Sequence, residues 1–94
     1  MKIFVMARGW VLCGEDTPDP TNPAFLILKN CGTVRNWGTQ NGLGELAKEG
    51  PKQGSTTIDV EPDGTRINML FLYREIPCDR TAWASWIAEQ ERKP

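Results

Sequence analysis

Residues 33–46, TVRNWGTQNGLGEL, contain the transition that sets the fold class of this chain. Thr33–Trp37 has the β-branched and aromatic residues that strands favour. A helix is predicted from near Asn41 through GLGELAKE, with Thr39 or Asn41 as its cap, because short polar side chains satisfy the first amides of a helix. Glycine and proline at 50–51 then end the helix. The stretch therefore predicts a strand that leads into a short helix.

The residues before this stretch predict two more strands. Lys2–Leu12 is rich in Ile, Phe, Val and Trp, and Gly9 is expected to mark a bulge within it. Gly14–Pro23 has three prolines and no large apolar residue, which predicts a loop and leaves open whether that loop is a lid. Ala24–Lys29 is apolar on both faces, as central and interface strands are, and Asn30–Gly32 is expected to turn the chain.

The second half of the chain predicts two strands and a second helix. Thr56–Val60 is followed by the turn signal EPDG at 61–64 and by the longest apolar run, Thr65–Ile76. Alternation along that run places one set of side chains on a single face: Ile67, Met69, Phe71 and Tyr73.

The last helix is expected over Arg80–Arg92, with Asp79 as its cap. Its apolar face, which would dock on the sheet or form a dimer contact, comprises Ala82, Trp83, Trp86, Ile87 and Gln90. The sequence therefore predicts an α+β fold in one domain, residues 1–94. The expected architecture is a small antiparallel sheet of four to five strands with one short helix and one C-terminal helix.

Charge and cysteine content exclude several classes of protein. Eleven basic and twelve acidic side chains give a formal charge of −1, which argues against broad electrostatic binding of nucleic acids. The three cysteines, at 13, 31 and 78, are odd in number and lack C-x-x-C spacing, so neither a disulfide scaffold nor a zinc site is expected. No segment resembles a signal peptide or a membrane span. We therefore expect a cytoplasmic protein with reduced thiols and no membrane partner.

The sequence lacks the usual means of catalysis. It has no histidine and no Walker-type phosphate loop, and its glycines match only part of a dinucleotide fingerprint. The carboxylate pairs Glu15–Asp16 and Asp59–Glu61 flank turns, where acids are commonly exposed. We therefore expect no enzyme, no catalytic residue, no metal and no cofactor.

The strand-to-helix stretch has the chemistry of a small anion site. The first amides of a helix are free to bind an anion, and glycines let a ligand approach them. Arginine can bind a phosphate with two hydrogen bonds, tryptophan can stack on a base, and hydroxyl or amide groups can add further bonds. The ligand-binding residues predicted here are Arg35, Trp37, Thr39, Asn41, Gly42 and Gly44. The alternative is that these residues only build the turn, the core and the helix.

Three residues outside this stretch could extend the same site. Arg8, Trp10 and Arg66 lie on predicted strands and would join it if those strands are neighbours of Thr33–Trp37. The sequence does not define that adjacency.

The run from Val34 to Ala47, followed by Gly50-Pro51 and Thr57–Asp59, resembles an uncharacterised family of small bacteriophage and prophage proteins. That family is similar to R-x-W-G-T-x-x-G-L-G-x-L-A-x-x-G-P-x-x-x-T-x-L-D with a later G-T-V-R. The last element stands here as GTRI at 64–67, with the arginine and the aliphatic residue in a different order. The resemblance covers about residues 35–67 and implies a phage origin, hence a host cytoplasm, without implying an activity.

Three functions are compatible with these residues. The first is a non-enzymatic phage protein that captures a phosphate-bearing small molecule, such as a cyclic nucleotide immune signal, to counter host defence; this step is an analogy with phage proteins that sequester such signals. The second is a protein–protein inhibitor or assembly factor that binds a host protein through tryptophans and apolar strands. The third is a single-stranded nucleic-acid binder, which the net charge disfavours. The apolar strands also predict a homo-oligomer.

Overall fold

The central strand is longer than the sequence predicts. In the computed structural model, which describes residues 1–92, β3 runs without a break from Phe25 to Asn36. The turn predicted at 30–32 is wrong, because Asn30 forms a β-bulge there, with φ of 47° and a shift in the register with the preceding strand. The Asn30 side chain donates a hydrogen bond to Glu15 Oε1 at 2.8 Å, which fastens the bulge to the neighbouring strand.

The first predicted strand is in fact a hairpin. β1 spans Lys2–Met6 and β2 spans Val11–Pro18, and the 3₁₀ turn η1, Ala7–Gly9, joins them. Arg8 and Gly9 both have positive φ, 66° and 80°, so the chain reverses where a bulge was expected.

Part of the predicted loop at 14–23 is also strand. Glu15–Pro18 pairs with Leu26–Lys29 of β3. β1 extends along β2 only as far as Gly14, so the missing N–H of Pro18 faces no partner strand. Only six residues, 19–24, remain between β2 and β3, and Asp19 holds them by accepting from the backbone and hydroxyl groups of Thr21 at 2.8 and 2.7 Å.

The longest predicted strand divides into three parts. β4, Thr57–Glu61, leads through the expected turn at 62–64 into β5, Thr65–Asn68. A 3₁₀ turn, η2, Met69–Phe71, follows, and Asn68 Oδ1 caps it by accepting from the Leu70 amide at 2.9 Å. β6, Leu72–Pro77, then pairs with β1. The predicted single apolar face is therefore wrong, because Ile67 is its only buried member.

Both predicted helices are present. α1 spans Leu43–Glu49, and Gly50 ends it with φ of 82° and a hydrogen bond to Leu46. α2 spans Arg80–Arg92, and the Asp79 carboxylate accepts from the amides of Thr81 and Ala82 at 2.9 and 3.3 Å, which confirms the predicted cap. The predicted caps of α1 are wrong, because the N-cap position is occupied by Gly42, which has no side chain to bond the first amides of the helix.

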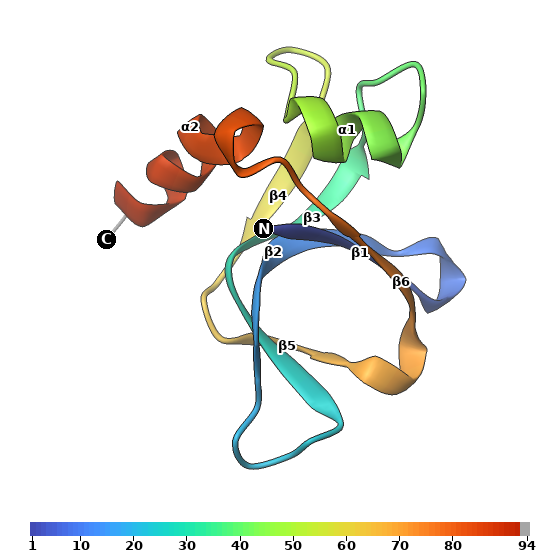
Figure 1. Cartoon of the computed structure of the whole chain (residues 1–94), viewed down its shortest axis with the longest axis vertical. Coiled ribbons are helices and arrows are strands. Elements are labelled where there is room, and N and C mark those ends of the chain that lie inside the picture. The colour runs from blue at the N-terminus through green and yellow to red at the C-terminus, as the bar shows by residue number, and fades with distance from the viewer. Residues whose placement is uncertain (93–94) are drawn as a thin grey trace.

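The six strands form one antiparallel sheet, so the predicted α+β class is confirmed with more strands than expected. The order is β4-β3-β2-β1-β6, and β5 pairs with the other half of β3. Figure 1 shows the sheet curled into a ring, with α1 and α2 together on one side of it.

Two apolar clusters hold these layers together. One lies between the helices and the sheet and includes Ile3, Val11, Val34, Leu46, Trp83 and Ile87. The other fills the inside of the curl and includes Phe4, Leu26, Leu28, Cys31 and Ile67. Neighbouring residues such as Ile3 and Phe4 point into different clusters, because successive side chains of a strand alternate between its faces. The inner strands are therefore buried on both faces.

Candidate functional site

The structure brings part of the predicted anion site together. Arg35 and Asn36 at the end of β3, with Trp37, Gly38 and Thr39 after it, line a shallow hollow of about 380 Å³. The Trp37 side chain is partly exposed there. Gly38 has φ of 72°, and a Cβ on it would lie 2.5 Å from the backbone of Ser55, so this glycine serves close packing. Three of the predicted ligand residues therefore share one surface.

The electrostatics of this hollow are less favourable to an anion than the sequence predicts. The Arg35 guanidinium forms an ion pair with Asp59 on the adjacent β4, and both side chains are largely exposed. A phosphate would have to compete with that carboxylate for the guanidinium. Glu45 in the first turn of α1 adds no free charge, because the Lys52 ammonium binds it at 3.3 Å.

The start of α1 is open, but the polar side chains beside it already have hydrogen-bond partners. Thr39 Oγ1 donates to the carbonyl of Gly42 at 2.7 Å, and Asn41 Nδ2 donates to Glu45 Oε1 at 2.9 Å. Nothing lies within 4 Å of a Cβ placed on Gly42 or Gly44, so the backbone there is accessible. Thr39 and Asn41 thus bond groups at the helix start, but neither side chain caps its free amides.

The three residues proposed to extend this site do not all join it. Arg66 on β5 pairs in register with Ile27, eight residues and about 26 Å of extended strand from Arg35. It instead binds Asp19 at 2.8 Å and stacks over Phe25 at 4.2 Å. Arg8 lies in the η1 turn, whereas Trp10 lies near Arg35, because Leu12 two residues after Trp10 pairs with Thr33 two residues before Arg35.

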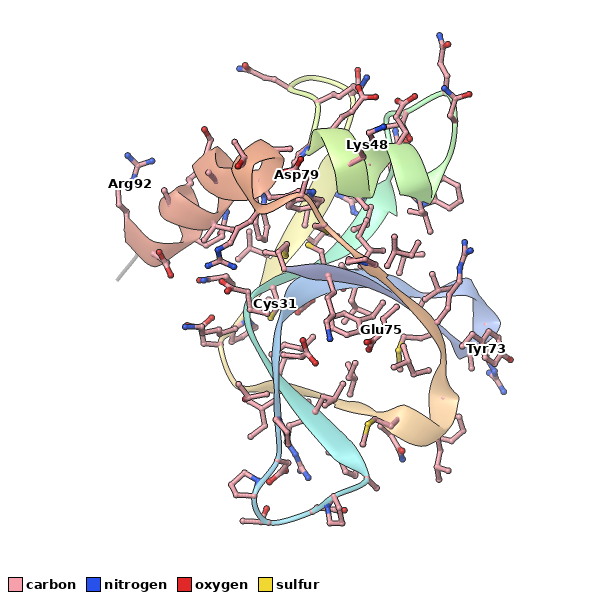
Figure 2. All side chains as sticks on the ribbon, viewed as in Figure 1. Cys31, Lys48, Tyr73, Glu75, Asp79 and Arg92 are labelled. Atoms are coloured by element: carbon pink, nitrogen blue, oxygen red, sulfur yellow. The ribbon has the colours of Figure 1, made fainter. Side chains whose placement is uncertain are left out.

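The most unusual feature of the molecule is an exposed apolar surface around η2. Leu70 is 80% exposed, Tyr73 72%, Phe71 54% and Met69 41%. Tyr73 lies beside the turn between β1 and β2, where Trp10 is 62% exposed (Figure 2). We call the four residues in and beside η2, Met69–Phe71 and Tyr73, the apolar surface. Large exposed apolar side chains that lie close together on a monomer commonly mark a protein contact.

Positive charge borders the apolar surface. Arg8 lies in the η1 turn and Arg74 follows Tyr73 in β6. No carboxylate of residues 1–92 lies within ion-pair distance of either guanidinium. Glu75 does not compensate them, because it points into the curled sheet and binds Lys2 at 3.1 Å (Figure 2).

The free edge of β6 is protected against strand addition. β6 is the last strand of the sheet path, but the register shift opposite Val5 and Met6 makes Tyr73 a bulge. Pro77 supplies no N–H, and Arg74 places a charge on the edge strand. Bulges, prolines and charges are the usual means by which edge strands avoid pairing. The side chains of the apolar surface, and not the backbone edge, are therefore its available contact.

Trp83 of α2 is not available for the protein contact that the sequence suggested. Trp83 is fully buried, and its indole N–H donates to the carbonyls of Leu46 and Ala47, each at 3.1 Å. The helix is thus docked on α1 and the sheet, as predicted. The sequence signal that could have identified the apolar surface is MLF at 69–71, which follows the polar Asn68 that caps the turn.

The three thiols are poor nucleophiles. Burial raises the pKa of Cys13 and of Cys78 to about 12, and burial also raises the pKa of Cys31. Within residues 1–92, no group of three or more Cys, Asp or Glu side chains is arranged to hold a metal ion.

Over the same residues, neither helix has the length and apolar character needed to cross a bilayer. No protein-family model, curated protein sequence or solved structure matches the chain.

Proposed function

We propose that this chain is a non-enzymatic binding protein that acts by attaching to another protein through its apolar surface. The exposure of Leu70, Phe71 and Tyr73 in and directly after the η2 turn supports this assignment. Such side chains weaken a monomer's solubility unless a partner covers them. Aromatic residues and arginine are also the residue types most enriched at interface hot spots.

The charges favour a different protein as the partner over a second copy. A two-fold contact through the apolar surface would bring the Arg8 and Arg74 side chains of both copies together, and like charges across an interface cost free energy. A partner with acidic residues around an apolar centre would complement this face. In line with the phage resemblance, we propose that the chain is phage-encoded and that this partner is a host protein.

A pull-down with matched variants tests the proposal. The test variant carries both Leu70→Ser and Phe71→Ser. The control variant is Val60→Ser, which removes an apolar side chain on β4 that is 49% exposed. Wild type, Val60→Ser and Arg35→Ala should retain one stoichiometric partner, and the double variant should lose it. Equal recovery by all four proteins would refute the role of the apolar surface.

A second candidate function is capture of a phosphate-bearing small molecule, including a cyclic nucleotide immune signal. It is favoured by one observation, the hollow that collects Arg35, Trp37 and Thr39. Calorimetry against mono-, di- and cyclic nucleotides and a short single-stranded oligonucleotide tests it. Arg35→Ala should abolish binding, and Asp59→Asn should strengthen it because the guanidinium loses its carboxylate partner. No heat with any ligand, or no change in Arg35→Ala, would eliminate this candidate.

A further inference from the structure

A separate groove lies between α2 and the loop that joins α1 to β4. It has a volume of about 570 Å³, within the range of small-ligand sites. Its loop wall is Pro51–Gly54 with Thr56, and its helix wall is formed by Ala82, Ser85, Trp86 and Glu89, with Ile58 on β4 between them. None of these residues belongs to the apolar surface or to the Arg35 hollow. We call it the α2 groove.

Both walls of the α2 groove are held in place. The Lys52 amide donates to Thr56 Oγ1 and the Thr56 hydroxyl donates to the Trp37 carbonyl, both at 2.8 Å. Gly50 is packed so closely on α2 that a Cβ would lie 2.3 Å from the Ala82 carbonyl oxygen. Trp86 packs edge-on against the buried Trp83, with ring centroids 5.7 Å apart. The groove is therefore formed before any ligand binds, which lowers the entropic cost of binding.

The charges of the α2 groove favour a cation. Lys52 is the only basic residue that lines it within the described part of the chain, and Glu45 and Glu49 bind its ammonium at 3.3 and 3.5 Å. Glu89 stands on the helix wall, and no basic group of residues 1–92 lies within ion-pair distance of it. Glu45 and Glu49 thus neutralise the Lys52 ammonium, which leaves the Glu89 carboxylate of the lining to bind a cation.

The aromatic ring in the same groove favours an organic cation over a metal ion. Tryptophan has the strongest cation–π attraction of the aromatic side chains. Trp86 and Glu89 are one helical turn apart and line the same groove, so one ligand can contact both. We propose that the α2 groove binds an organic ammonium or guanidinium group against Trp86 and Glu89. The group can belong to a free amine or to a basic side chain of a peptide.

Nuclear magnetic resonance titration of the whole chain tests this proposal, with two probes. Agmatine represents a free amine, and the blocked peptide acetyl-Gly-Lys-Gly-amide represents a basic side chain; sodium chloride at the same ionic strength is the blank. We expect saturable shifts of the Trp86 indole N–H and of the Ser85 and Glu89 amides. Tighter binding of agmatine assigns the site to free amines, and tighter binding of the peptide assigns it to protein side chains.

Two variants and one matched control decide the mechanism. Glu89→Gln should weaken binding about fivefold, the upper range for an exposed charge pair. Trp86→Phe should weaken it about threefold, because a phenyl ring attracts cations less. Glu91→Gln is the control: it removes the same charge two residues away on α2, and its amide oxygen can still accept the bond from Asn30. Absence of saturable shifts with both probes, or equal effects of Glu89→Gln and Glu91→Gln, would overturn the proposal.

Discussion

The indole N–H of Trp83 on α2 donates to the carbonyl of Leu46 near the end of α1 at 3.1 Å. It donates to the Ala47 carbonyl at the same distance, so one side chain bonds two of the last carbonyls of the shorter helix. Carbonyls in the last turn of a helix have no amide partner within that helix, apart from the one that a cap residue can supply. The bond therefore joins the two helices where both cover the sheet.

Trp83→Phe should destabilise the protein by about 1–3 kcal/mol, because it removes a buried donor and leaves part of the indole volume empty. Urea denaturation followed by circular dichroism measures the loss. Trp10→Phe, at a largely exposed position, should change the free energy of unfolding by about 0.5 kcal/mol or less. Equal effects of the two substitutions would contradict the role assigned to Trp83.

Gly50→Ala should cost more stability than Gly54→Ala, although both glycines have φ of 82°. A Cβ at Gly54 meets nothing within 4 Å, whereas one at Gly50 meets the Ala82 carbonyl oxygen at 2.3 Å. Both variants strain the backbone at a positive φ, and Gly50→Ala bears the larger strain because its ψ of 173° is a conformation that essentially only glycine adopts. Only Gly50→Ala must also displace α2. Thermal unfolding of Gly50→Ala and Gly54→Ala measures the difference in stability between the two variants. Similar unfolding midpoints would show that α2 can move away from residue 50 without a loss of stability.

The Glu15 carboxyl should make the protein sensitive to acid. Burial alone would raise its pKa, but hydrogen bonds from Asn30 and Arg80 outweigh burial and hold that pKa below its usual value of 4.5. A carboxyl whose pKa falls on folding stabilises the fold above the unfolded pKa and loses that contribution as pH drops. Stability should therefore decrease below about pH 4.5, and Glu15→Gln should lower stability at pH 7 by about 1 kcal/mol and flatten the acid limb. An unchanged acid limb in the variant would assign the acid sensitivity elsewhere.

The thiols should react slowly with a disulfide reagent in the native state. A pKa of about 12 at Cys13 and Cys78 leaves a thiolate fraction of roughly 10⁻⁴ at pH 8, and only the thiolate attacks. Labelling with a chromogenic aromatic disulfide at pH 8 should be slow in buffer. It should be fast in about 6 M urea, where all three thiols react as ordinary cysteines. Rapid labelling of either residue in the native protein would show that its burial is transient.

The homo-oligomer predicted from the sequence can be checked on the purified chain. If the apolar surface serves a different protein, light scattering should give the same mass for wild type and for the Leu70→Ser, Phe71→Ser variant. A dimeric wild type that becomes monomeric in this variant would assign the apolar surface to a second copy instead. A dimer that persists in the variant would place the self-contact on another face.

Local signals in the sequence were sufficient for the type of most elements. The strand before Trp37, the helix that ends at Gly50 and the Asp79 cap all depend on residues within a few positions of one another. Helical spacing also identified Trp83 as an anchor. These predictions hold because capping bonds and periodic burial act within one or two turns of the chain.

Strand boundaries could not be predicted in the same way. Arg8 lies where the chain reverses and has a positive φ that non-glycine residues seldom adopt. Asn30 continues β3, although the residues Asn30–Gly32 suggest a turn. In both cases pairing with distant residues determines the conformation. The sheet contacts thus override the local preference.

Local residue patterns were enough to predict an α+β chain with a strand-to-helix stretch, a C-terminal helix and a set of candidate ligand residues. Long-range packing was needed to establish that Arg35 is paired with Asp59 and that Leu70 and Tyr73 are exposed. The partner and the burial of a side chain depend on register between strands far apart in the chain and on where helices dock. Such relations arise from long-range packing, which no local pattern of residues encodes.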